Sequence, residues 1–308
     1  MQISRRDFLK AGIAAGTALT LPASSLYAQP TALLQKKIPS TGESVPIIGI
    51  GTARRYEEIQ RAEEKTPLKA TIQRFKELRG KVIDSSPSYG TAEAVVGEIV
   101  NELKARDALF LATEVSLRDS GREAGIKQIE QSFKRLRTDK IDLLAVHNLR
   151  DTETQLRTIR EMKQAGRVRY VGITTSFENQ YPEFEQTIRK EILDFIQVDY
   201  ALDNRNASER IIPLAGDRGM AVMINLSFGR GRLFNAVQGK KVPEWAAEID
   251  CSSSAQFFLK YIVSHPAVTC AVPGMAKPEY VSDNLGAARG RLPDAAMRRR
   301  MENFIDAV

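Results

Sequence analysis

The stretch Lys81-Val82-Ile83-Asp84-Ser85-Ser86-Pro87-Ser88-Tyr89-Gly90-Thr91-Ala92-Glu93 decides the fold of this 308-residue chain. The apolar pair Val82-Ile83 directly precedes the acid Asp84, and turn-forming Ser, Pro and Gly residues follow it. Apolar residues then recur at helical spacing. The pattern predicts a buried strand that ends at Asp84, a loop that carries Tyr89 and a helix that begins near Thr91. An acid at the carboxyl end of a parallel strand, followed closely by a phenol, is typical of the catalytic rim of barrel enzymes. The same residues also suit a capped helix with an aromatic cover over the core, so the rest of the chain has to decide.

The remaining sequence alternates short apolar runs with amphipathic segments. Strand-like runs lie at 45–52, 82–84, 108–114, 141–147, 168–174, 195–198, 221–226 and 268–272. Helical segments lie between them, at 54–78, 91–103, 121–136, 152–164, 182–190, 207–217 and 253–263. Near-continuous apolar strands that alternate with amphipathic helices indicate a parallel sheet covered on its outer face. Eight such units predict an α/β fold of the closed (β/α)8 type, a TIM barrel, as a single domain over residues 29–308. No G-x-G-x-x-G follows the first strand, which argues against an open dinucleotide-binding sheet.

Residues 1–28 have the pattern of a twin-arginine signal peptide. The core Ser4-Arg5-Arg6-Asp7-Phe8-Leu9-Lys10 precedes a Gly/Ala-rich apolar run, and small residues lead to Ala28, where we expect cleavage. The apolar run is too short and too rich in glycine for a membrane anchor, so we expect no stable span after cleavage. The pattern predicts a partner, the twin-arginine export machinery, and a periplasmic protein that folds, with any cofactor, before export.

The charge balance favours a small anionic ligand over nucleic acid. The formal net charge is +7, and no polybasic run or interleaving of arginines with aromatic residues is present. A mild basic excess of this kind indicates a phosphate-bearing ligand and argues against a base-stacking surface. The two cysteines, Cys251 and Cys270, have no metal-ligand spacing, and we expect two buried free thiols rather than a disulfide.

Polar side chains recur at the carboxyl ends of the predicted strands, which face a single site in a barrel. They are Asp84 and Tyr89, Glu114, His147, Thr174 and Thr175, and Gln197. His147 is one of only two histidines, and its place at a strand end favours a functional role over a core role. The other, His265, precedes Pro266 before the last strand, at the opposite end of the barrel, where we expect a structural role.

Seven motifs, in their order and spacing, make residues 38–290 resemble an aldo/keto reductase. They are I-D-S-S-P-S-Y-G-T-A-E at 83–93, L-A-T-E-V at 111–115, S-F-K-R-L-R-T-D-K-I-D-L-L-A-V-H at 132–147, V-G-I-T at 171–174, I-Q-V-D-Y at 196–200, G-R-G-R-L at 229–233 and P-G-M-A-K-P-E-Y-V-S-D-N-L at 273–285. The resemblance implies reduction of a small aldehyde or ketone, or oxidation of an alcohol, with NADP(H). It implies that Tyr89 protonates the carbonyl oxygen, that Asp84 supports Tyr89 and that His147 orients the substrate.

Glu114 is the largest departure from the family pattern, which has a lysine at this position. A phenol donates a proton well at neutral pH only when a neighbour stabilises the phenolate, and a carboxylate does the opposite. Three interpretations follow. Glu114 is protonated and acts as a proton donor or polarises the carbonyl, or a metal ion bridges Asp84, Glu114 and His147, or the site has lost carbonyl reduction and kept binding.

The resemblance also assigns the cofactor pocket, with further departures around the nicotinamide. Thr174 and Thr175 stand where Ser-Asn is usual, Gln197 is kept for the carboxamide, and Asn225 with Leu226 replaces the usual stacking aromatic ring. The glycine-rich loop suits a pyrophosphate, because backbone amides and two guanidiniums meet there. The residues assigned to the first strand end, the loop and the adenosine segment are Gly51, Thr52, Gly229, Arg230, Gly231, Arg232, Leu233, Pro273, Gly274, Lys277, Asp283 and Asn284.

Three functions therefore compete. The first is an exported NADP(H)-dependent oxidoreductase of aldo/keto reductase type that holds its cofactor tightly and has an atypical site. The second is an exported nucleotide- or ligand-binding protein that has lost carbonyl reduction, and a metal-dependent barrel enzyme is a third. The segment 234–250, which contains Trp245, is expected to form part of the substrate wall.

Overall fold

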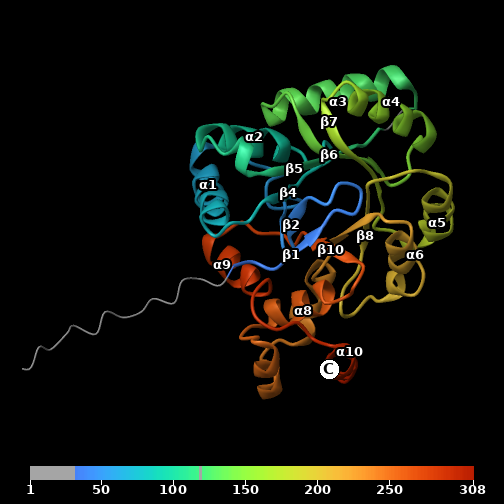
Figure 1. Ribbon diagram of the computed structural model, residues 1–308. Helices are drawn as coiled ribbons and strands as arrows, with labels where there is room; N and C mark the ends of the chain where they lie inside the picture. Colours follow the sequence, from blue (N-terminus) through green and yellow to red (C-terminus); the bar gives the residue numbers. More distant parts are fainter. Residues whose placement is uncertain (1–31, 118–119) are drawn as a thin grey trace, which may run out of the picture. The chain divides into compact units, whose positions relative to one another are not determined.

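The computed structural model describes residues 32–117 and 120–308, so the expected signal peptide lies outside the described residues. A curved eight-stranded parallel sheet surrounds the centre of the described chain, and helices cover it on the outside (Figure 1). Its strands follow the chain in order: β3 Ile50–Gly51, β4 Val82–Asp84, β5 Phe110–Val115, β6 Ile141–His147, β7 Val168–Thr174, β8 Phe195–Asp199, β9 Ala221–Asn225 and β10 Val268–Ala271. Parallel bridges from Ile48 to Ala271 and from Gly51 to Gly274 join the first strand region to the last. The predicted (β/α)8 barrel is therefore confirmed.

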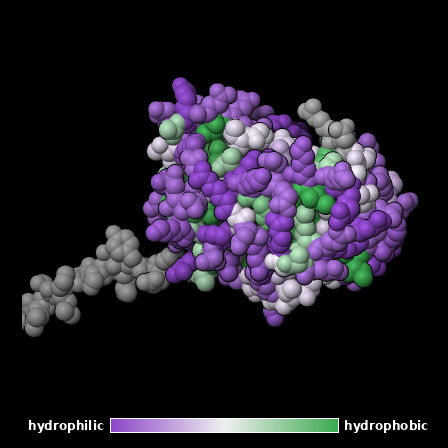
Figure 2. Space-filling view, turned by 90° about the horizontal axis from the view of Figure 1, so that it is seen from above, coloured by the Kyte–Doolittle hydropathy of each residue, from purple (hydrophilic) through white to green (hydrophobic). Residues whose placement is uncertain are grey.

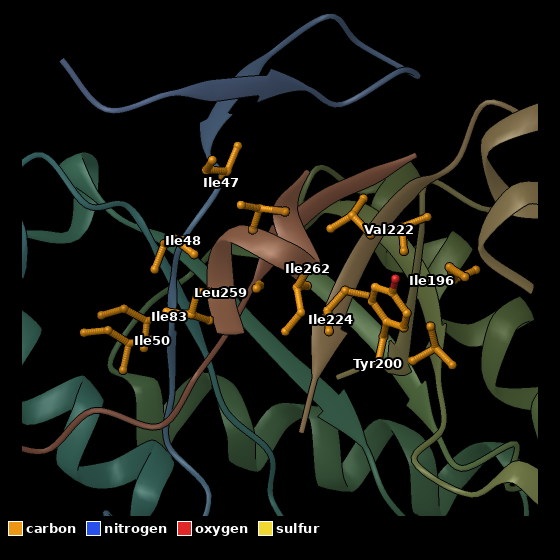
Figure 3. Close-up of a cluster of buried hydrophobic side chains, with 14 of the residues drawn as sticks. Ile47, Ile48, Ile50, Ile83, Ile196, Tyr200, Val222, Ile224, Leu259 and Ile262 are labelled. Atoms are coloured by element: carbon orange, nitrogen blue, oxygen red, sulfur yellow. The ribbon is translucent and has the colours of Figure 1, made fainter. Parts of the chain in front are cut away.

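The helices, one or two after each strand of the barrel, pack their apolar faces on the sheet. They are α1 Ala62–Glu77, α2 Ala92–Glu102, α3 Arg122–Leu136, α4 Thr152–Gln164, α5 Tyr181–Lys190, α6 Ile211–Asp217, α7 Arg232–Ala236, α8 Ser254–Val263, α9 Pro278–Gly286 and α10 Ala295–Asp306. In α3, Ile129, Phe133 and Leu136 recur at helical spacing and are buried. Burying such a side chain stabilises the fold by roughly 1.5–3 kcal/mol. Figure 3 shows the same arrangement under α8, where Leu259 and Ile262 lie among isoleucines of the strands.

A β-hairpin that the sequence did not predict closes the amino end of the barrel. Strands β1 (Gln35–Lys37) and β2 (Ser44–Pro46) pair antiparallel, and Ile38 and Val45 pack into the cluster of side chains that fills the barrel interior. Lys36 Nζ donates to the backbone oxygens of Val263, His265 and Val268 at 2.6–3.0 Å. The ammonium thus fixes the hairpin to the turn before β10, and His265 lies at this end, as expected.

The first strand and the first helix are shorter than predicted. The run 45–52 is divided, because Pro46 ends β2 and β3 comprises only Ile50–Gly51. The polar segment 54–78 becomes helical only at Ala62. Residues before Ala62 are held as a loop by tertiary bonds, since Thr91 Oγ1 donates to Tyr56 O at 2.8 Å and the Tyr56 hydroxyl donates to Met275 O at 3.1 Å. These long-range bonds override the helix propensity of the segment.

The surface is mostly hydrophilic, with small apolar areas scattered over the face that Figure 2 shows. Within the described ranges, no helix combines the length and apolar character needed to cross a bilayer. Cys251 and Cys270 are both buried and unpaired, as expected.

Candidate active site

Asp84 lies at the carboxyl end of β4, fully inside the mouth of the barrel. Gln197 of β8 donates from Nε2 to Asp84 Oδ2 at 3.2 Å. Since β4 and β8 are four places apart in an eight-stranded sheet, this bond crosses the barrel. Burial, and then the charge of Glu114, raises the pKa of the Asp84 carboxyl well above its ordinary value, and the Gln197 bond opposes them. Two predicted site residues from distant parts of the chain are thus brought together.

Glu114 contacts His147, a pairing that the sequence did not predict. The two residues lie on the neighbouring strands β5 and β6, where Glu114 is in register with Ala145, two positions before His147 on the same face of the strand. Glu114 Oε2 is in hydrogen-bond contact with His147 Nδ1. The Glu114 side chain is 3% exposed and the His147 side chain 17%. An almost completely buried carboxylate therefore faces an imidazole that is open to the barrel mouth.

Tyr89 occupies the loop after β4 and is half-buried, and its hydroxyl donates to no described residue. Burial raises the pKa of the Tyr89 hydroxyl well above its ordinary value, and the charges of Glu114, Asp84 and Glu57 raise it further. Arg230 acts in the opposite direction. The effect of Glu114 has the sign that the sequence predicted, because a carboxylate near the phenol disfavours the phenolate.

The strand ends beside Gln197 carry polar atoms that have no partner in the protein. Asn225 donates from Nδ2 to Thr175 O at 3.2 Å, which leaves its Oδ1 buried and unpartnered among the described residues. Ser227 Oγ, which the sequence analysis did not single out, is also buried and unpartnered there. Thr174 is buried and in register with both His147 and Gln197. Unpaired buried polar atoms are costly unless a ligand or water satisfies them, so this group fits a carboxamide.

A pocket of about 300 Å³ adjoins these strand ends. Its walls are formed by the last residue of β8 and by residues that follow β7, β8 and β9, namely Ser176, Phe177, Glu178, Asn179, Asp199, Tyr200, Ala201, Asn204, Leu226, Gly229, Arg230 and Arg232. Arg230 has no hydrogen-bond or ion-pair partner in the described part of the chain, whereas Arg232 pairs with Asp203 at 3.0 Å. Leu226 and Arg230 have positive φ angles of 50° and 57°. A strained loop that presents an unpaired guanidinium to a pocket is suited to an anion.

Glycine is required at position 229. Its φ is +56°, and a Cβ there would lie 2.9 Å from both Arg232 Nη2 and Asp203 Oδ2. The missing side chain thus makes room for the Arg232–Asp203 pair. Gly231 is also left-handed, with φ +99°, and Leu233 is buried in the short helix that follows.

Gly51 and Thr52 have structural partners. A Cβ at Gly51 would lie 2.4 Å from Val272 O, so glycine is needed for the close contact between β3 and β10. The buried Thr52 donates from Oγ1 to Asp84 O at 3.0 Å. Gly51 is in register with Asp84 and Thr52 bonds to its carbonyl oxygen, so both residues hold the backbone at Asp84 in place.

The adenosine segment follows β10. Gly274 bridges Gly51, directly after Pro273. Lys277 precedes α9, and its ammonium lies 5.6 Å from the centre of the Tyr280 ring. Asp283 accepts hydrogen bonds from Ser253 and Gln256. Asn284 is buried. Of this segment, Lys277 retains a charge that no described carboxylate neutralises.

Asp199 is a rim residue that the sequence analysis missed. It accepts from the Tyr181 hydroxyl at 3.1 Å and from Asn204 Nδ2 at 2.9 Å, and it lines the pocket. Burial raises the pKa of its carboxyl. The sequence contained a signal for this residue: Asp199 is two residues after Gln197, so side-chain alternation places both on the same face of β8.

One alternative and one expectation about the surroundings of the site are not supported. The described residues contain no cluster of three or more His, Cys, Asp or Glu side chains placed to hold a metal ion, so Asp84, Glu114 and His147 do not form the ligand set considered above. Trp245 was expected in the substrate wall. Its ring instead packs on Phe257 and Phe304, with Arg300 4.2 Å from its centre, and so helps to attach α10.

Comparisons with known proteins agree on one family. The model of the aldo/keto reductase family matches residues 47–302, and the model of the twin-arginine translocation pathway signal sequence matches residues 2–22. The chain is 31% identical to aldo-keto reductase YhdN of Bacillus subtilis over 69% of its own length and 66% of the relative, just under two thirds of it. It is 29% identical to methylglyoxal reductase YeaE of Escherichia coli over 85% and 93%.

Solved structures show the same fold. An aldo-keto reductase from Klebsiella pneumoniae in complex with NADPH superposes with a TM-score of 0.75 and 23% identity, over 89% of this chain and 95% of that one. A glycerol dehydrogenase from Gluconobacter oxydans gives a TM-score of 0.73 and 20% identity, over 89% and 95%.

Proposed function

The chain belongs to the aldo/keto reductase family, and from this premise we propose that it is an exported NADP(H)-dependent oxidoreductase that interconverts a small aldehyde or ketone and its alcohol. The observation that carries the proposal is the convergence of Asp84, Glu114, His147 and Gln197 at one end of the barrel, beside a pocket lined by the Gly229–Arg232 loop. Proton-transfer groups and an anion-binding loop on the same rim are what a nicotinamide-dependent reduction requires.

Residues of the pocket, of the neighbouring end of β9 and of the segment before α9 would together bind the cofactor. Arg230 would bind the pyrophosphate, since it faces the pocket without a protein partner, and the unpartnered Asn225 Oδ1 would accept from the carboxamide. Lys277 is the cation that favours NADP over NAD through the 2′-phosphate. When bound, the reduced nicotinamide supplies a hydride to the carbonyl carbon. The protein orients the ring and handles the proton.

Export of the folded protein follows from the signal at residues 2–22, and we propose the periplasm as its destination. The twin-arginine route carries folded proteins, so the cofactor can be bound before export. We further propose that the cofactor is held tightly, because reduced nicotinamide is not freely supplied outside the cytoplasm. A second substrate would then regenerate it.

A nucleotide titration followed by a carbonyl screen tests the proposal. We expect NADPH to bind more tightly than NADH, and NADPH to be oxidised when a small aldehyde or ketone is added. Methylglyoxal is the first compound to test, because one relative is named for its reduction. Protein that binds neither nucleotide, or that oxidises no NADPH with any carbonyl, would contradict the proposal.

The second candidate is a nucleotide-binding protein without reductase activity. It is favoured by the raised pKa of the Tyr89 hydroxyl, which makes this residue a poor proton donor. Nucleotide binding without carbonyl reduction in the same screen would support it.

A further inference from the structure

The contact between Glu114 and His147 fixes which nitrogen of the imidazole faces the barrel mouth. An ionised carboxylate can only accept hydrogen bonds, so an ionised Glu114 in contact with Nδ1 requires the ring proton on Nδ1. Nε2 makes no hydrogen bond to any described residue, and the ring is partly open to the mouth. In the neutral ring Nε2 is therefore the free base, and in the charged ring it is a free acid.

Three acidic side chains act electrostatically on Tyr89, the expected proton donor. Glu114, Asp84 and Glu57 all act on its hydroxyl in the direction that disfavours the phenolate, and the exposed Arg230 acts against them. The lysine that would offset these charges is absent, because Glu114 stands in its place. Transfer of the Tyr89 proton to a substrate would therefore leave a buried phenolate whose charge is opposed by that of Glu114, which is electrostatically costly.

The same carboxylate has the opposite effect on an imidazolium. Glu114 stabilises a positive charge on the His147 ring, holds the ring in one orientation and fixes its tautomer, as the carboxylate does in other carboxylate–histidine pairs. The exposed side of the ring, with Nε2, is left to meet the substrate oxygen. The replacement of lysine by glutamate thus weakens one proton donor and strengthens another within the same site.

We propose that His147 Nε2, positioned by Glu114, is the group that gives the proton to the substrate oxygen in reduction and takes it in oxidation. This inference rests on the proposed function. In reduction the carbonyl carbon receives the hydride and its electron pair from NADPH, the O–H bond forms as the Nε2–H bond breaks, and the products are the alcohol, NADP⁺ and a neutral imidazole still bonded to Glu114. His147 is then the catalytic residue, Glu114 is a positioning residue, and Tyr89 serves to bind the substrate oxygen.

Nitrogen NMR of the full protein labelled with ¹⁵N-histidine tests the pairing without turnover. The chain has only two histidines, so the spectrum contains two rings. Burial, Arg298 and Lys36 lower the pKa of His265 to about 4, so this ring stays neutral at ordinary pH and serves as an internal reference. We expect the neutral His147 ring to carry its proton on Nδ1, and Glu114→Gln to shift it toward the Nε2–H form because an amide can donate to Nδ1.

Glu57→Gln is the matched control, since it removes a carboxylate that acts on Tyr89 without touching His147. It is expected to leave the His147 nitrogen shifts unchanged. A wild-type ring that carries its proton on Nε2 would overturn the proposal, and this result needs no variant.

Kinetics then separates the two possible proton donors. We expect His147→Gln to lower kcat by a factor of at least ~100, the usual size of a general-acid contribution, and Tyr89→Phe to lower it by less than ~10. Glu114→Gln should lower kcat more than it changes KM, and Glu114→Asp should restore part of the loss. Loss of reduction in Tyr89→Phe with retention in His147→Gln would overturn the proposal.

The two proposals fail in different ways. A wild-type protein that reduces no carbonyl contradicts the proposed function, and the proton-transfer role falls with it. Reduction that depends on Tyr89 rather than His147 contradicts only the role given to the Glu114–His147 pair.

Discussion

Asp84 and Gln197 face each other across the mouth of the barrel, joined by a 3.2 Å hydrogen bond between strands four places apart in the eight-stranded sheet. The bond favours the ionised carboxylate, but burial and the charge of Glu114 outweigh it, so the pKa of Asp84 is raised. The site therefore contains an acid whose neutral form is favoured by the fold.

Asp84→Asn is expected to stabilise the protein at neutral pH. An acid with a raised pKa in the folded state stabilises fully below its ordinary pKa of 3.8, and this stabilisation is lost as pH rises toward the folded-state pKa. The asparagine variant keeps a neutral side chain at every pH. We expect its free energy of unfolding to exceed that of the wild type at pH 7, with the difference shrinking toward pH 4.

Denaturant unfolding at several pH values measures this difference, with Asp139→Asn on the exposed surface as the control. A difference that stays constant with pH would show that the carboxyl of Asp84 titrates normally.

Glu114→Lys should transfer the proton-donor role to Tyr89. The substitution removes a negative charge from beside the phenol and adds a positive one, so the pKa of Tyr89 falls toward its ordinary value, while the contact with His147 is lost. We expect carbonyl reduction at or above the wild-type rate. In this background Tyr89→Phe should lower kcat by ~100-fold or more, against less than ~10-fold in the wild type. Equal effects of Tyr89→Phe in the two backgrounds would show that Glu114 does not determine the donor.

Arg230→Ala is expected to weaken NADPH binding by about 10- to 100-fold, because a charge-assisted hydrogen bond contributes ~1.5–3 kcal/mol. Arg299→Ala on α10 is the matched control, since Arg299 is also exposed and has no ion-pair partner among the described residues. Fluorescence titration with NADPH measures both. Unchanged affinity in Arg230→Ala would place the pyrophosphate elsewhere.

Gly229→Ala and Gly219→Ala separate backbone strain from crowding. Both glycines have positive φ, +56° and +69°, but a Cβ at Gly219 meets nothing within 4 Å, whereas one at Gly229 meets Asp203 and Arg232. We expect each variant to lose about 1 kcal/mol of stability from strain. Only Gly229→Ala should also weaken NADPH binding, because it displaces the Arg232–Asp203 pair. Equal nucleotide affinity in the two variants would argue that the pair has no part in the pocket.

The barrel could be predicted because its signal is periodic. The expected ranges for β7 and α4 agree with the structure residue for residue, since each has a continuous pattern with clear ends. The predicted elements differ from the structure where tertiary contacts determine the backbone conformation. The loop before Ala62 is polar and helix-prone, and it stays irregular because Thr91 and Met275 bind its backbone and its tyrosine. The hairpin at Gln35–Pro46 is too short to give a periodic signal.

The residues that form the site could be predicted better than the contacts between them. Strand ends placed Asp84, Glu114, His147 and Gln197 on one rim, because side-chain alternation and a common sheet edge suffice for that. The Glu114–His147 contact depends on the register of β5 against β6, in which Glu114 is opposite Ala145. No pattern within either strand specifies that register. The orphaned Ser227 Oγ likewise depends on the path of an irregular loop.

The hairpin of β1 and β2 gives the barrel a single entrance. Ile38 and Val45 fill the amino end from within, and Lys36 fastens the hairpin to three carbonyls beside it. Any two molecules that meet inside must therefore arrive and depart through the same opening. Under the proposed function, the ligand that lies deeper in this opening would therefore bind first and leave last.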